Sequence, residues 1–158
     1  MNTNETIEQR AKSMYPTATN VEKATLEKLL GKSFFRGSII DRVKTFEEAC
    51  SEKGVDPLDM LPYEDPKNKF HNAVNAFAKM TIITEVLNEG WTPDWENERE
   101  YKWAPYFRMK SGFGFSRTIC DSTRTGTAVG SRLCFKSQEL ADYAGKQFES
   151  VYKEYLTL

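Results

Sequence analysis

The chain is poor in the residues that build metal sites and disulfide frameworks. It has one histidine, His71, and three widely spaced cysteines, Cys50, Cys120 and Cys134. No C-x-x-C pair occurs, whereas a structural zinc site needs four nitrogen or sulfur ligands, usually in paired spacing. Free thiols in a reducing compartment are the more ordinary explanation of such cysteines. We therefore expect no metal and no cofactor.

Long apolar runs are also missing. No stretch approaches the ~18 consecutive apolar residues that can cross a membrane. Residues 1–16 have no apolar core, which argues against a signal peptide. A disordered chain would lack the aromatic content of 13% found here. We expect a cytoplasmic protein without a membrane partner, folded as a single domain over 1–158, in which 1–17 form either a short helix over 7–14 or a loose arm.

Start signals and apolar spacing predict helices in the first two thirds of the chain. Capping boxes predict helices over 19–31 and 45–54, each ending at a glycine. Asp65, followed by a proline, predicts the start of the longest helix, about 23 residues ending near Gly90. Residues 32–44 fit either a short strand with a turn or an irregular apolar segment.

The last third alternates apolar and polar residues with the period of a strand. Strands are expected within 101–110, 113–119 and 133–135, with Pro105 at an edge or a bulge. Trp103 and Phe107 share the expected core face, and Tyr106 lies opposite them with Arg108. A final helix follows Ser137, and its Gly145 either weakens it or permits a close helix–sheet approach. The predicted fold is α+β: a small antiparallel three-stranded sheet packed against a long central helix and a C-terminal helix.

The strand region also has a charge opposite to that of the rest of the chain. Residues 101–137 contain seven basic residues, among them Lys102 and Lys136, and one acid, whereas the whole chain has a net charge of −1. Their loop from Asp121 to Arg132 combines guanidinium groups, hydroxyls and glycines, the donors that bind an anion or phosphate. It is not a P-loop, because G-x-x-x-x-G-K-[ST] is absent. The alternative is a solvated hairpin loop whose arginines pair with acids of the helices.

The candidate ligand-binding residues are drawn from this basic segment. They are Tyr106, Arg108, Arg117, Arg124, Ser131 and Arg132. The arginines of the loop and its approach, with Ser131 and backbone amides, would neutralise a phosphate, and Tyr106 or a tryptophan would stack on a base. The alternative for the aromatic rings is core and edge packing.

Catalytic residues cannot be assigned. The carboxylates between residues 85 and 100 have no spacing that fixes two of them in one pocket, and they fit a solvated face or a counterweight to the basic strands. His71 has no nucleophile near it in the sequence. Cys120 and Cys134 could face each other on neighbouring strands, yet a catalytic thiolate needs a base that the sequence does not offer. We expect a protein that is not an enzyme.

Three segments resemble a family of small proteins encoded by phages and prophages of gut Bacteroidales. They are DRVKTFEEAC (41–50), VLNEGWTPDW (86–95) and above all GSRLCFKSQELADYAGKQF (130–148). The resemblance covers most of the chain from about residue 30 onward. It brings no activity and no site residues, but it implies a protein made inside a bacterium during phage infection.

The sequence thus leads to a hypothesis and a rival. The hypothesis is a phage-encoded binding protein in the cytoplasm of the bacterial host. It would engage an anionic ligand, a nucleotide-type molecule or a short nucleic acid, through the basic β-segment, and so counter a host defence. The rival is a structural or interaction protein of the virion, in which the strands pair with copies of themselves or with a neighbouring subunit. Binding to a host protein and a homo-oligomer both stay open.

Overall fold

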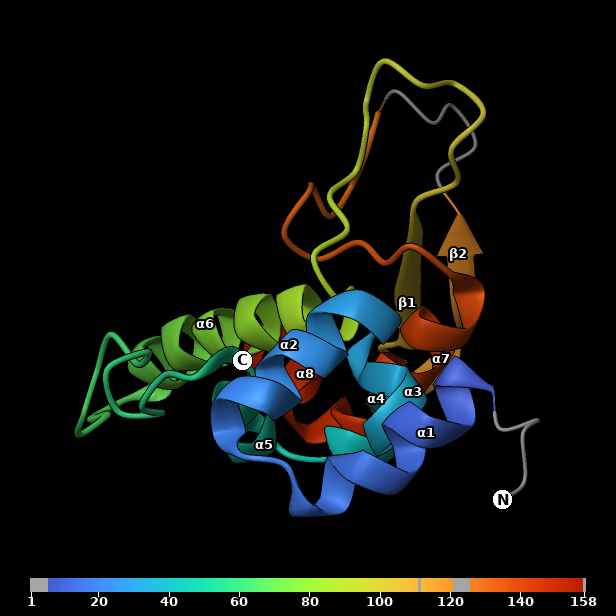
Figure 1. Cartoon of the computed structure of the whole chain (residues 1–158). Coiled ribbons are helices and arrows are strands. Elements are labelled where there is room, and N and C mark those ends of the chain that lie inside the picture. The colour runs from blue at the N-terminus through green and yellow to red at the C-terminus, as the bar shows by residue number, and fades with distance from the viewer. Residues whose placement is uncertain (1–5, 111, 121–125, 158) are drawn as a thin grey trace. The chain divides into compact units, whose positions relative to one another are not determined.

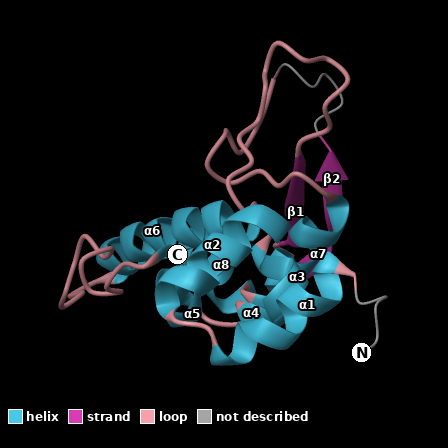
Figure 2. Cartoon of the chain, in the orientation of Figure 1, coloured by secondary structure: helices cyan, strands magenta, loops and turns pink. Residues whose placement is uncertain are grey.

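A computed structural model of the chain describes residues 6–110, 112–120 and 126–157. The chain divides into two compact units, Met1–Arg42 and Val43–Leu158. The first unit is helical, and the second combines helices with an antiparallel pair of strands (Figure 2). The predicted α+β class is confirmed.

The first unit is a succession of short helices. They are α1 (Ile7–Met14), the 3₁₀ turn η1 (Tyr15–Thr17), α2 (Asn20–Leu30), α3 (Lys32–Arg36) and α4 (Ile39–Arg42). The predicted capping box opens α2: the Glu22 amide donates to Thr19 Oγ1 at 3.4 Å, and the Glu22 carboxylate accepts the Thr19 amide at 2.7 Å. Gly31, with φ of +86°, ends the helix.

Residues 32–44 form two short helices, so neither a strand nor an irregular segment is correct there. In the helical conformation, two neighbouring side chains of α3 each contact another part of the first unit. Phe35 stacks on Tyr15 with ring centroids 4.4 Å apart. Arg36 Nε lies 2.7 Å from Glu27 Oε1. These tertiary contacts outweigh the β-like run of apolar residues.

The second unit contains the longest helix and the strands (Figure 1). Its elements are α5 (Phe46–Lys53), α6 (Lys69–Leu87), β1 (Trp103–Arg108), β2 (Gly114–Cys120), α7 (Gln138–Gln147) and α8 (Glu149–Leu156). Helix α6 packs against α5 and α8, whereas α7 covers the strands. Helix α8 contacts both α6 and β2 and so links the long helix to the strands, which the sequence predicted to pack on each other directly.

Helix α6 begins three residues later than predicted. Asn68 is the N-cap, and its Oδ1 accepts the amide of His71 at 3.0 Å. Asp65, the predicted cap, forms an ion pair with Lys67 instead. Because Asn and Asp cap helices about equally well, the sequence alone does not separate the two positions.

The predicted C-terminal helix is two helices. Phe148, with φ of −108° and ψ of 26°, separates α7 from α8. The change of direction gives each helix its own partner, with α7 on the strands and α8 on α6. Glu149, at the start of α8, accepts the amide of Phe115 at 2.8 Å and so holds the second helix to β2 as well.

The third strand is reduced to one bridge among the described residues. Trp103 and Phe135 exchange two backbone hydrogen bonds, of 3.0 and 2.8 Å. The next residue of β1 that faces the same edge is Pro105, which has no N–H to donate. The side chain of Asn88 binds the opposite side of this segment: it donates to the carbonyl of Cys134 at 2.9 Å and accepts the amide of Lys136 at 3.0 Å.

The strands approach their covering helix closely. A β-bulge places Tyr106 opposite Arg117 and Phe107 opposite Phe115. As predicted, Phe107 is buried and Tyr106 and Arg108 are exposed, but Trp103, which was expected in the core, is only half-buried. On α7, a Cβ added to Gly145 would lie 2.3 Å from the Phe115 ring, so this glycine permits the close helix–sheet approach.

Candidate functional site

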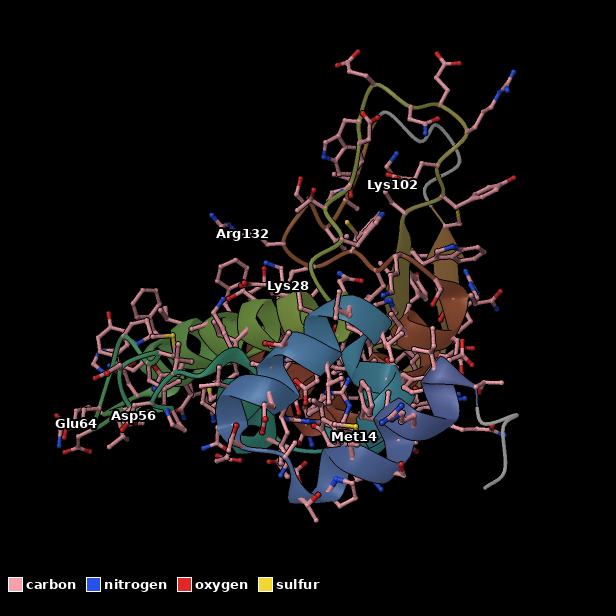
Figure 3. All side chains as sticks on the ribbon, in the orientation of Figure 1. Met14, Lys28, Asp56, Glu64, Lys102 and Arg132 are labelled. Atoms are coloured by element: carbon pink, nitrogen blue, oxygen red, sulfur yellow. The ribbon has the colours of Figure 1, made fainter. Side chains whose placement is uncertain are left out.

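The structure separates the predicted ligand-binding residues into two groups. Tyr106, Arg108 and Arg117 belong to the strands. Ser131 and Arg132 lie on the loop before the Phe135 bridge, and Figure 3 shows Arg132 near α6 and well away from the strands. Arg124 lies outside the described residues. The basic β-segment is therefore not one binding surface in its described parts.

On the strands, the aromatic ring and the arginine engage each other. Tyr106 and Arg117 are cross-strand partners, and the guanidinium carbon of Arg117 lies 4.7 Å from the centre of the Tyr106 ring. This is a cation–π pair at an exposed position, since Tyr106 is 45% exposed. One face of the predicted stacking ring is thus already covered.

Part of the basic charge is internal. Lys102 is only 1% exposed. Its ammonium donates to the carbonyls of Asp94, Glu100 and Asn97 at 2.5, 3.0 and 3.3 Å, and it lies 3.3 Å from the Glu100 carboxylate. Lys136 pairs with Glu89 at 3.3 Å. These two lysines hold neighbouring segments together, so the net charge of the segment exaggerates the charge it offers to a ligand.

Residues 91–102 form an acidic connector, a loop between α6 and β1 that side-chain hydrogen bonds hold together. Glu100 accepts the Asp94 amide at 2.8 Å and the Trp91 indole N–H at 3.3 Å. The Trp95 indole donates to Ser131 Oγ at 2.8 Å. The connector therefore lies beside the segment that leads to the Phe135 bridge, as the two traces in Figure 1 show. The prediction of an internal counterweight holds for Glu100 and Glu89.

Between this loop and α6 lies a cavity of about 430 Å³. Thr84 and Glu85 of α6 line it, together with Trp91 and Pro93 of the connector. Ser131 and Arg132 complete the lining from the opposite segment. Three parts of the chain that are far apart in the sequence thus enclose one space, and two of the predicted site residues lie in it.

Some polar groups of the cavity already form hydrogen bonds or ion pairs within the protein, and others are still able to bind a ligand. Glu85 forms an ion pair with Lys53, and both ends of the Asn88 amide are hydrogen-bonded. Ser131 Oγ accepts from Trp95, so its own hydrogen can still be donated. Arg132 is exposed and forms no hydrogen bond or ion pair with a described residue. The free donors at the mouth of the cavity are those that an anion needs.

Thr84 is a cavity residue that the sequence did not indicate. It is 2% exposed, and its Oγ1 is the buried side-chain polar atom that has no hydrogen-bond partner in the described part of the chain. Its position fits the apolar stripe of α6, and that spacing by itself indicates a core residue. A hydroxyl within an otherwise apolar stripe is the one signal that could have singled it out.

The histidine and two of the cysteines considered for catalysis are packed against, or buried among, other residues of the protein. His71 stacks on Tyr63 with ring centroids 3.8 Å apart, and its Nδ1 accepts the Lys67 amide at 3.2 Å. Cys50 and Cys134 are fully buried, and burial raises the pKa of the Cys50 thiol. Over the described ranges, no three His, Cys, Asp or Glu side chains gather into a group that could hold a metal ion.

None of the helices in the described part of the chain has the length and apolar character needed to span a membrane. The resemblance to phage and prophage proteins stays a prediction, and the function has to be argued from the cavity itself. No protein-family model, curated protein or solved structure matches this chain.

Proposed function

We propose that this chain is a non-enzymatic binding protein whose cavity beside α6 takes a small anionic ligand of nucleotide type. The observation that carries the proposal is Arg132, an exposed cation without a described partner, at a cavity of about 430 Å³ that also holds the donor hydroxyl of Ser131. A guanidinium binds carboxylate and phosphate groups through two parallel hydrogen bonds.

A small molecule fits this arrangement better than a strand of nucleic acid. A strand binds through several phosphates at once, and each needs a cation along its path. Among the described basic residues, Arg132 is the one that lines the cavity, whereas Arg117 covers Tyr106 and Lys102 is buried. Of the two anionic partners expected from the sequence, the nucleotide-type molecule is therefore the one we retain.

The biological setting follows from the resemblance alone. A small protein that captures a nucleotide-type molecule inside an infected bacterium could withdraw a signal used in host defence. This setting is cytoplasmic and needs no reaction, in keeping with the absence of an assigned catalytic group in the sequence.

One observation favours the rival function, an interaction protein of the virion. Phe70, Phe77 and Tyr155 line a shallow apolar groove of about 360 Å³ on α6 and α8, and Phe70 is 67% exposed. Exposed apolar patches often mark protein–protein contacts. Mass spectrometry of purified phage particles distinguishes the virion function from the ligand-binding function, because a virion component must be present in the particles.

Thermal unfolding with a panel of nucleotides tests the binding function. A ligand at 100 times its Kd stabilises the folded protein by about 2.7 kcal/mol. We expect Arg132→Ala to abolish the stabilisation and Arg117→Ala, an arginine outside the cavity, to retain it. If no nucleotide raises the Tm, or if the Arg117 variant alone loses the effect, the proposal is wrong.

A further inference from the structure

Thr84 holds a buried hydroxyl that forms no hydrogen bond within the described residues. Threonines within helices commonly donate to a carbonyl three or four residues earlier. Thr81, on the same helix, donates to the Ala78 carbonyl at 2.8 Å, and Thr25 donates to the Val21 carbonyl at 2.9 Å. Thr84 Oγ1 makes no such bond, although Thr84 is 2% exposed. A buried polar group without a partner lowers the stability of the folded state.

This hydroxyl belongs to the cavity that contains Arg132. Thr84 lines the cavity with Ser131 and Arg132, and its burial places it at the inner end, whereas those two residues are exposed at the mouth. Asn88, the buried polar neighbour one turn later, is fully occupied by the Cys134 carbonyl and the Lys136 amide. A buried hydroxyl at the inner end and a cation at the mouth, neither with a partner among the described residues, are complementary to one elongated polar ligand.

The charges of the lining limit the ligand further. The carboxylate of Glu85 lines the same cavity as Arg132 and forms an ion pair with Lys53. A chain of phosphates would bring several negative charges close to that carboxylate, and like charges at short range repel. A single anionic group at Arg132 avoids this repulsion. The half-buried Trp91 and Pro93 supply apolar walls for an uncharged body.

Resting on the proposed function, we propose that the ligand carries one anionic group and a polar uncharged end, as a nucleoside monophosphate does. The anionic group binds Arg132 and Ser131, and the polar end of the body forms a hydrogen bond with Thr84 Oγ1. The Thr84 hydroxyl is therefore a ligand-binding group, and its burial without a partner in the ligand-free protein lowers the free energy of unfolding.

A comparison of threonine variants in the full chain tests this inference. Thr84→Val keeps the shape and removes the hydroxyl. We expect its urea midpoint to rise, because a buried unsatisfied group is gone, and its affinity for nucleoside monophosphates to fall about tenfold, because a ligand hydrogen bond is lost. Thr84→Ser should keep the affinity. Thr81→Val is the matched control, since Thr81 lines the same cavity but its hydroxyl is already used, and its affinity should stay close to that of the parent protein.

A second series uses one base with no, one or three phosphates, measured by calorimetry on the parent protein and on Arg132→Ala. The monophosphate should bind most tightly. If the triphosphate binds more tightly through Arg132, or if Thr84→Val keeps full affinity or does not raise the urea midpoint, this inference is wrong while the proposed function stands. If none of these molecules binds, both are wrong.

Discussion

Arg117 and Arg132 come from the same basic segment of the sequence but occupy different situations. Arg117 lies on β2 and covers the ring of its cross-strand partner Tyr106. Arg132 lies at a cavity and has no described partner. The difference teaches that the charge of a segment says little about where a ligand binds. What distinguishes a candidate binding arginine is the absence of a partner and the presence of a space beside it.

The strand pair and the cavity beside α6 are also stabilised by different interactions. The strands depend on close packing, with the Phe115 ring pressed against Gly145 of α7. The cavity wall depends on hydrogen bonds, in which Lys102 and Glu100 fix the connector and Trp95 ties it to Ser131. A substitution in one region should therefore leave the function of the other largely intact, and the following predictions test that separation in order of decreasing effect.

The largest effect is expected for Lys102→Met. It removes a buried cation, takes the ion-pair partner from the Glu100 carboxylate and removes the ammonium donor from the carbonyls of Asp94, Asn97 and Glu100. We expect a loss of about 3 kcal/mol in the free energy of unfolding, measured with urea, and a clear loss of ligand affinity. Lys110→Met, at an exposed position, is the control and should change neither quantity. A stable Lys102→Met protein would refute the role given to this lysine.

Gly145→Ala should affect the strands alone. The added methyl group meets the Phe115 ring and Pro105, so a net loss of about 2 kcal/mol is expected even though alanine favours the helix. Ligand affinity, measured on the folded fraction, should stay unchanged because the cavity lies elsewhere. Ser150→Ala, on the exposed side of α8, should shift the urea midpoint little. If affinity falls with Gly145→Ala, the two regions are coupled and the comparison fails.

Trp95→Phe removes the hydrogen bond between the connector and Ser131. We expect a stability loss of about 1 kcal/mol and a moderate loss of affinity, because Ser131 is no longer held in position. Isothermal titration of the ligand measures the second effect. Since Ser131 keeps its hydroxyl, Ser131→Ala should weaken binding more than Trp95→Phe does. The opposite order would show that the connector, rather than Ser131, contacts the ligand.

Tyr106→Leu should have the smallest effect. The exposed cation–π pair with Arg117 contributes only about 0.5 kcal/mol, and neither residue lines the cavity. Stability should change within that amount, and binding should not change at all. Loss of nucleotide binding in this variant would show that the ligand binds at the strands, as the sequence indicated, and not in the cavity.

Local signals in the sequence predicted the two helices that begin at a Thr-x-x-Glu capping box. The capping boxes at Thr19 and Thr45 mark α2 and α5, because a cap is satisfied within four residues. Ser131 and Arg132 were also identified, although as parts of a loop on the sheet and not as the wall of a cavity beside α6.

Features that depend on contacts between distant residues were missed. The predicted third strand is reduced to one bridge, and Asn88, more than forty positions away, binds the backbone groups of Cys134 and Lys136 that point away from Trp103. Lys102 alternates like a surface residue, yet carbonyls of the preceding loop enclose it. Thr84 has the spacing of a core residue, and only the packed structure shows its hydroxyl without a partner.

Pro105 has a consequence for assembly. A strand edge recruits a strand from another molecule by offering a row of N–H and C=O groups, and a proline interrupts that row. The outer edge of β1 is interrupted in this way beyond the Trp103 bridge. If copies of this protein join through their strands, the contact has to be made by β2, whose sequence contains no proline.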